Sequence, residues 1–181
     1  MAKYIVVNTA NVKATNERLY SGRLDTEAHN GIMGTLGDFV DTEIREFIPA
    51  TTDSIRDELP FMIMDPEMIK TATTRGQAMI GHYRIEAGKA FVVMPLEVRD
   101  EIEVSQDLVE ADDEVAEGDI IAIQVGGGLK KVGVAPLKSA AKAYFKVTAV
   151  RNAFIAQQPF GHGIAAAAPH KMYMLELVLA K

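Results

Sequence analysis

The sequence predicts a mainly β protein, an antiparallel β-sandwich or barrel with a few short helices. Short apolar or alternating runs recur along the 181 residues and are separated by Gly, Pro, Asn and Asp. Strands do not alternate regularly with full-length helices, as they would in a doubly wound sheet. The apolar fraction of 48% and the charged fraction of 24% are typical of a globular domain with its own core.

Each expected strand is rich in β-branched, aromatic or other apolar residues and is bounded by turn residues. In chain order the expected strands are Tyr4–Asn8, Arg18–Leu24, Ile32–Val40, Glu43–Ile48, Phe61–Met64, Gly81–Ile85, Ala90–Met94, Glu101–Val104, Asp119–Val125, Leu129–Val134, Ala143–Val150 and Lys171–Leu179.

Three segments carry helical signals. The clearest is "DPEMIKTA", in which Asp65 suits an N-cap, Pro66 the first helical position and Glu67 the positive end of the helix dipole. The segments "TTDSIRDEL" and "APLKSAAKAY" (135 to 144) carry weaker signals, and each is expected to form one or two turns on the flank of a sheet.

Three consecutive glycines, Gly126 to Gly128, raise the question of a phosphate-binding loop. A P-loop ends in Lys-Ser or Lys-Thr and opens a helix, whereas "LKKVGVAP" follows here, with Pro136 close behind. We therefore expect no nucleotide binding. The glycines instead predict a hairpin that joins Ile120–Val125 to Leu129–Val134, with positive φ angles in the turn.

Two segments, "EAGKAFVV" from residue 86 and "AEGDIIAI" from residue 116, share an acidic residue and a glycine before an apolar strand. This pattern indicates a tight turn that leads into a strand. It places the main β-barrel or sandwich domain at residues 86–181, after an N-terminal strand and arm (1–17) and a β-rich region with short helices (18–85).

The composition excludes several classes of function. The formal net charge of −6, with no long basic block, disfavours nucleic-acid binding. The absence of cysteine excludes disulfides, thiolate catalysis and cysteine metal sites. No apolar stretch approaches the roughly 20 residues of a spanning helix, so we expect a soluble protein without a membrane partner.

Candidate catalytic and metal-binding patterns are weak. The four histidines, His29, His82, His162 and His170, show no H-x-H or HExxH spacing. The acidic segment "EADDEVAEGD" (110 to 119) lacks the ligand order of an EF-hand, and a solvated turn is the better interpretation. We expect no catalytic residues, no metal and no cofactor, and hence no enzyme.

Two segments are suited to contacts with other proteins. The N-terminal strand with Tyr4, Ile5, Val6 and Val7 is suited to extending the sheet edge of another chain. The long segment between the last two expected strands carries Phe154, Ile155, Phe160 and Ile164 among Gly, Ala and Pro. It either packs over the domain as a lid or is covered by a neighbouring subunit.

The pattern and order of several segments resemble a known family. They are "NGIMGTLGDFVDTEIREFIPATTD", "PFMIMDPEMI", "YRIEAGKAFVVMP", "GLKKV", "YFKVTAVRNAF" and "MYMLELVL". Over most of the chain they resemble small β-rich head decoration (cement) proteins of tailed bacteriophages. This resemblance implies a virion structural protein made in the host cytoplasm and carried on the capsid exterior, with the major capsid protein as partner, homo-oligomeric and without catalytic residues.

Two alternatives from other classes stay open. A barrel-type small-ligand binder or cupin-like enzyme would need histidines and carboxylates clustered on adjacent strands, and histidine is sparse. An OB-like nucleic-acid module would need a basic face interleaved with aromatic residues, whereas the lysines here are dispersed.

Overall fold

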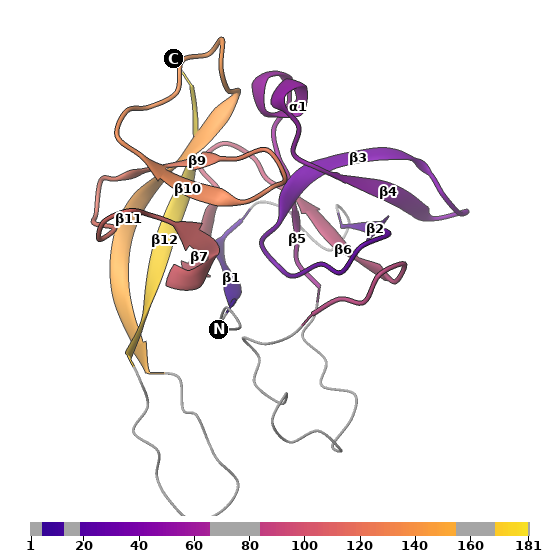
Figure 1. Cartoon of the computed structure of the whole chain (residues 1–181), viewed down its shortest axis with the longest axis horizontal. Coiled ribbons are helices and arrows are strands. Elements are labelled where there is room, and N and C mark those ends of the chain that lie inside the picture. Colours follow the sequence, from indigo (N-terminus) through magenta and orange to yellow (C-terminus); the bar gives the residue numbers. More distant parts are fainter. Residues whose placement is uncertain (1–4, 13–18, 66–83, 155–168, 181) are drawn as a thin grey trace, which may run out of the picture.

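The computed structural model describes residues 5–12, 19–65, 84–154 and 169–180 of the chain. They form two β lobes side by side, a closed five-stranded barrel and a seven-stranded sheet (Figure 1). The predicted class, mainly β with few helices, is confirmed.

The barrel is built from consecutive strands of the first half of the chain. They are β2 (Tyr20–Arg23), β3 (Met33–Phe39), β4 (Ile44–Pro49), β5 (Phe61–Ile63) and β6 (Ala90–Pro95). Their order around the barrel is β2-β4-β3-β5-β6, and β6 pairs with β2 to close it. The β2–β4 pair is parallel and the other pairs are antiparallel.

The second lobe combines the N-terminal strand with the second half of the chain. Its strands are β1 (Val7–Asn11), β7 (Glu101–Ser105), β8 (Val109–Glu110), β9 (Ile120–Ile123), β10 (Leu129–Val132), β11 (Ala143–Phe154) and β12 (Pro169–Leu179). The sheet order is β1-β7-β12-β11-β9-β10-β8, so β1 and β8 are its two edges. The long β11–β12 hairpin is central, and one end of it projects beyond its neighbours (Figure 1).

Strand pairing does not coincide with the division expected at residue 86. Strand β6 follows that residue, yet it closes the barrel between β2 and β5. Strand β1 belongs to the expected N-terminal arm, yet it pairs antiparallel with β7 in the sheet. Both pairings join strands that are distant in the sequence, which local patterns do not encode.

Two hydrophobic clusters follow from this topology. A small one fills the barrel, with Phe47 against Phe91 in an edge-to-face contact (centroids 5.7 Å apart) and Ile63 and Val93 fully buried. The larger cluster includes Met33 and Met62 from the barrel together with buried residues of the sheet such as Phe145. Because this cluster includes residues of both lobes, the seam between them is part of the core.

Two of the three segments with helical signals lie in the described ranges; one forms a helix and the other a single turn. Helix α1 (Thr52–Asp57) begins at a capping box, in which Thr51 and Ser54 each accept a hydrogen bond from the other's backbone N–H. In the segment 135 to 144, where one or two turns were expected, Ala140 N–H and Ala141 N–H both donate to the Leu137 carbonyl, and β11 begins at Ala143. The helix expected from Asp65 falls on residues outside the described ranges. A short 3-10 helix, η3 (Gln106–Leu108), was not expected.

Both predicted turn-to-strand entries are confirmed. Gly88 and Gly118 have φ angles of 75° and 91°, and they precede β6 and β9 respectively. In each turn a backbone bond spans three residues, from Lys89 N–H to the Glu86 carbonyl and from Asp119 N–H to the Ala116 carbonyl. The two glycines supply the left-handed backbone that each turn needs.

Candidate protein interface

The structure corrects the expected side-chain contacts of the N-terminal strand. Ile5 and Val7 are only 4% and 3% exposed and belong to the large core cluster. Their side chains therefore pack inside the chain and are not available to a partner. Val6, between them, is half-buried, and Tyr4 lies outside the described residues.

The backbone of β1 has an outer edge, here called the open edge, to which no strand of the described residues is paired. Ser105 N–H donates to the Val6 carbonyl at 2.9 Å, and Val6 N–H donates to the Ser105 hydroxyl at 3.0 Å. The peptide groups of Val6 thus face β7, and by the alternation of antiparallel pairs those of Val7 and Thr9 face the other way. No strand of the described part of the chain pairs with this outer edge.

A bulge shapes the end of this edge. Thr9 lies opposite Ile102 and Asn11 lies opposite Glu101, so Ala10 is an extra residue in β1. Such bulges bend a strand and limit the length over which it can pair. The open edge is therefore short, and its outward donors and acceptors belong to Val7 and Thr9.

The second set of predicted contact residues begins at the last residue of β11 and continues into the segment that follows it in the sequence. The hairpin register extends to the pair Phe154 and Pro169, and only the backbone of Phe154 is described. Ile155, Phe160 and Ile164 lie outside the described residues. Whether this segment packs as a lid or meets a neighbouring subunit stays a prediction.

The glycine-rich turn joins β9 to β10, as predicted, and it also contacts the barrel. Gly126 and Gly127 have φ angles of 90° and 83°. Gly126 N–H donates to the Ala50 carbonyl at 2.8 Å, and Met33 N–H donates to the Gly127 carbonyl at 2.9 Å. A Cβ atom on Gly127 would lie 2.2 Å from the Met33 carbonyl oxygen. The glycines thus serve the seam between the lobes, because their amide and carbonyl groups are engaged there.

Lysines neutralise much of the acidic segment 110–119. Lys131 Nζ lies 3.0 Å from Asp113 and 2.8 Å from Asp119, Lys130 pairs with Glu110 at 2.9 Å, and Lys171 pairs with Glu114. The pKa of Asp119 is lowered by the Ala116 N–H and by Lys131, and the pKa of Glu114 is lowered by Lys171. These contacts fit the solvated turn expected from the sequence.

The histidines give little indication of a metal centre. His29 Nδ1 is 2.8 Å from the Asn30 carbonyl oxygen, and His170 lies in β12. His82 and His162 fall outside the described residues. Over residues 5–12, 19–65, 84–154 and 169–180, no three His, Asp or Glu side chains are grouped as metal ligands would be.

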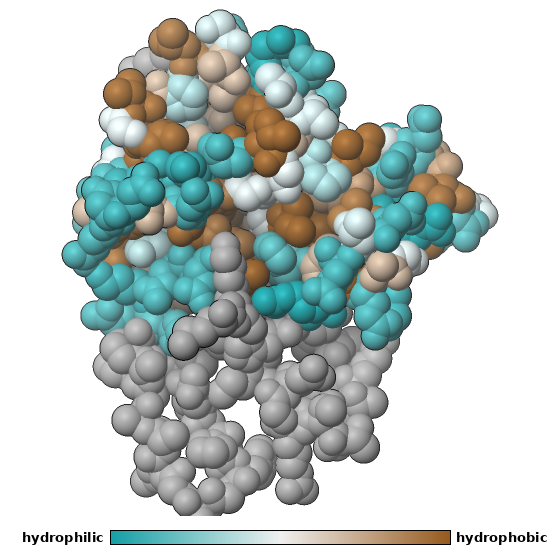
Figure 2. All heavy atoms as spheres, viewed as in Figure 1, coloured by the Kyte–Doolittle hydropathy of each residue, from teal (hydrophilic) through white to brown (hydrophobic). Residues whose placement is uncertain are grey.

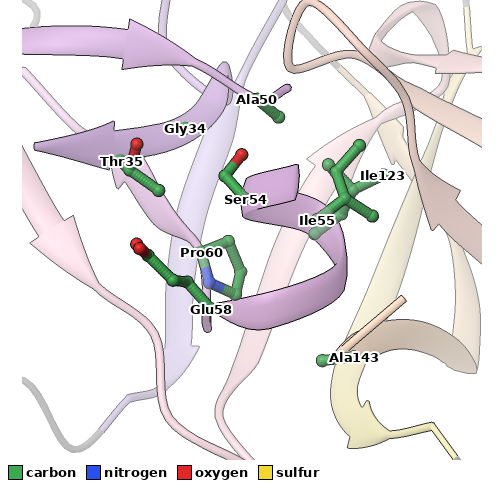
Figure 3. A pocket seen from close by; sticks show the side chains of 9 residues that line it. All are labelled: Gly34, Thr35, Ala50, Ser54, Ile55, Glu58, Pro60, Ile123 and Ala143. Carbon is green, nitrogen blue, oxygen red and sulfur yellow. The ribbon is translucent and has the colours of Figure 1, made fainter. Parts of the chain in front are cut away.

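A small pocket marks the seam between the lobes. Figure 3 shows Thr35 of β3 together with Ser54 and Glu58 of the α1 region on one side. Ile55 of α1 lies beside Ile123 of the sheet on the other side, with Ala143 below them. Its volume of about 10 Å³ leaves room for no more than about one water molecule. This pocket is therefore too small for an organic ligand. Aromatic and aliphatic side chains are buried inside the barrel.

Comparison with known proteins gives no relative from which a function can be carried over. No protein-family model, curated protein or solved structure matches the chain. Of the helices in the described ranges, none is long and apolar enough to span a membrane.

Sequence reasoning missed two residues of the β1 edge. Ser105 is fully buried and anchors Val6 through its hydroxyl and amide groups. Thr9 directs its peptide groups outward. Neither stands in a recognisable motif, and both roles depend on the pairing of strands nearly 100 residues apart.

Proposed function

We propose that this chain is a capsid decoration protein, which binds the outside of the head of a tailed bacteriophage across junctions of the major capsid protein. The observation that carries the proposal is the open outer edge of β1. The order of sequence motifs that resembles phage decoration proteins supports the same function.

Pairing with a capsid strand is the contact that this edge favours. An added strand would accept from and donate to the outward peptide groups of Val7 and Thr9. The buried side chains of Ile5 and Val7 hold the strand in place, so little ordering is required on binding. The bulge at Ala10 keeps the pairing short and limits uncontrolled edge-to-edge association.

Charge and multiplicity support an exterior location. The net charge of −6 disfavours the DNA-filled interior of a head. A shell offers many equivalent junctions, so a modest contact at each one stabilises the assembled state by mass action. For the alternative function, binding of a small ligand inside the barrel, the interior is occupied by packed side chains, among them Phe47 against Phe91.

The test measures binding to heads that lack the chain. Heads are prepared from a phage genome from which the gene is deleted and mixed with purified protein, and the bound copies are counted after sedimentation. Deletion of residues 1–12 is unsuitable because it removes Ile5 and Val7 from the core. Thr9→Pro removes one outward N–H and leaves the side facing β7 intact.

The matched control is Thr9→Ala, which changes the side chain and keeps the N–H. We expect the wild type and Thr9→Ala to saturate the heads at one regular stoichiometry. Thr9→Pro is expected to bind about tenfold more weakly or worse, because one hydrogen bond is lost and its acceptor on the capsid strand is left without a donor. Circular dichroism verifies that the variants are folded. Equal binding of Thr9→Pro would exclude the β1 edge as the contact, and failure of the wild type to bind heads would exclude decoration.

A further inference from the structure

Exposed large apolar side chains gather at two places on the described surface. Of the eight such residues, four lie at one end of the barrel and three at one end of the sheet; Val125 is the eighth. Isolated exposed apolar residues are common on proteins, but groups of them mark surfaces that bind.

The first group, here called the tip patch, consists of Leu19, Tyr20, Phe39 and Val40. The β3–β4 hairpin turns after Val40, where Val40 N–H donates to the Ile44 carbonyl at 2.8 Å. Strand β2 runs parallel to β4, with Ser21 opposite Ile44, so Leu19 and Tyr20 lie at the same end of the barrel. Phe39 is 68% exposed, which is unusual for a phenylalanine.

The aromatic ring of the tip patch is held by its own hairpin. The Arg45 guanidinium lies 5.3 Å from the centroid of the Phe39 ring, and its Nε–H donates to the Gly37 carbonyl at 2.8 Å. This cation–π contact orients the exposed ring before any partner arrives. A preoriented side chain loses less entropy on binding.

Acidic residues border the tip patch. Asp38, Asp41 and Glu43 are exposed on the same hairpin, and they make no ion pair with any residue that the structure describes. Figure 2 shows hydrophobic and hydrophilic residues side by side at the end of this hairpin, on the right of the view. The patch therefore suits an apolar surface bordered by basic residues.

The second group, here called the loop patch, consists of Val134, Leu137 and Leu179. Val134 and Leu137 are 80% and 68% exposed in the connection from β10 to β11. Leu179 pairs with Ala143 at the end of β12, and Ala180 N–H donates to the Lys142 carbonyl at 3.0 Å. These contacts bring the end of β12 to the same connection, at the upper end of the sheet lobe in Figure 1.

The loop patch carries the opposite charge. Residues 133–142 contain Lys138 and Lys142 and no acidic residue. Lys138 is exposed and makes no ion pair with the described residues, whereas Lys142 lies near enough to Asp57 to lower the pKa of that carboxyl group, after the larger effect of Arg56. Lys138 is therefore the principal cation offered to a partner at this patch.

We infer that copies of this chain associate head to tail, with the tip patch of one copy seated on the loop patch of the next. Each patch has the apolar centre and the charge that the other requires. The patches lie on different lobes, well apart in Figure 1, so they meet between chains and not within one chain. Such a heterologous contact builds rings or open chains of subunits. The inference does not depend on the decoration proposal, whose contact is the β1 edge.

The experiment uses two complementary variants of the full chain and sedimentation velocity over a range of concentrations. The tip variant carries Phe39→Ser and Asp41→Asn, and the loop variant carries Leu137→Ser and Lys138→Gln, so that the two altered patches carry no complementary charge. The wild type is expected to sediment faster as its concentration rises, and less so at high salt because screening weakens the charge pairing. Each variant alone is expected to associate about tenfold more weakly or not at all.

The decisive sample is an equal mixture of the two variants. The loop variant retains an intact tip and the tip variant retains an intact loop, so the mixture is expected to form a 1:1 complex that does not grow further. Val125→Ser, which alters the exposed valine outside both patches, is the control and is expected to behave as the wild type. Three results would each overturn the inference. The wild type could stay monomeric, either variant alone could associate as the wild type does, or the mixture could fail to form the 1:1 complex.

Discussion

At Gly127 the missing side chain lets two parts of the fold meet. The turn between β9 and β10 approaches the barrel so closely that Met33 N–H bonds to the Gly127 carbonyl, and the neighbouring Gly126 N–H bonds to Ala50. The sequence predicted the hairpin and its positive φ angles from the run of glycines alone. It did not predict the contact with the barrel, because nothing near residue 127 specifies which distant strand the turn faces.

The three glycines of this turn make a graded test. We expect Gly127→Ala to lower the free energy of unfolding by about 2–4 kcal/mol, because the left-handed backbone is strained and the added Cβ meets the Met33 carbonyl oxygen. Gly126→Ala has the backbone strain without the steric clash and is expected to cost about 1 kcal/mol.

Gly128→Ala is the matched control. Gly128 is not among the glycines with positive φ, and an added Cβ there would meet nothing within 4 Å. It is expected to change stability by about 0.5 kcal/mol or less. Urea unfolding measures all three. Equal losses for Gly127→Ala and Gly128→Ala would contradict the proposed role of the turn at the seam.

Among the elements, strands were predicted well where a short apolar run stands between turn residues. The expected strand Ala90–Met94 differs from β6 by a single residue, because Gly88 gives a clear start. Strand β11 extends four residues beyond the predicted end at Val150, because these residues pair with β12. The sequence did not indicate this extension, because the residues do not continue the apolar pattern. The helical signal at 135 to 144 produces no more than one turn, because the segment is short and β11 begins at Ala143.

The acidic segment 110–119 supports a prediction about pH. The pKa values of Asp119 and Glu114 lie below their ordinary values of 3.8 and 4.5, so their contribution to stability is complete above about pH 5 and is lost as the pH falls through the lowered values. Asp119 and Asp113 raise the pKa of Lys131 above its ordinary value of 10.5. The stability that the charge of Lys131 contributes is therefore present throughout the acidic and neutral range and is lost only when the pH rises through the raised pKa.

Lys131→Met tests this arrangement by thermal unfolding between pH 3 and pH 7. We expect the Tm of the wild type to exceed that of the variant at pH 7. The difference in Tm is expected to narrow toward pH 3, as the carboxylates begin to bind protons. Lys138→Met, at a lysine without an ion pair in the described part of the chain, is expected to follow the wild type. A Lys131→Met gap that is constant with pH would show that packing of the lysine stem, and not its charge, accounts for its effect.

For the whole molecule, the fold class could be predicted from the sequence, whereas the pairing of strands that are distant in the sequence could not. The class was predictable because most strands carry a local signal; the two-residue strand β8 (Val109–Glu110) was not expected. The division into lobes was not, because β1 pairs with β7 and β6 closes the barrel with β2 across long stretches of chain. For the candidate interface, the sequence indicated that the N-terminal strand could lie at a sheet edge, and β1 does so. It did not indicate that the side chains of Ile5 and Val7 are buried in the core of the same chain.

The shared core predicts that the two lobes unfold together. Met33 is fully buried, belongs to barrel strand β3 and lies in the cluster that includes the sheet residue Phe145. We expect circular dichroism and tyrosine fluorescence to report one coincident urea transition. Met33→Ala is expected to shift this single transition by about 2–5 kcal/mol. Two separate transitions, with only one of them moved by Met33→Ala, would contradict the shared core.

The most direct test of the decoration function is a difference map from cryo-electron microscopy of two phage heads, one from the complete genome and one from a genome without this gene. The proposal predicts additional density on the outer surface at regular junctions of the major capsid protein, with the sheet lobe and its β1 edge against a capsid strand. Identical shells, or a difference confined to the interior or the tail, would contradict it.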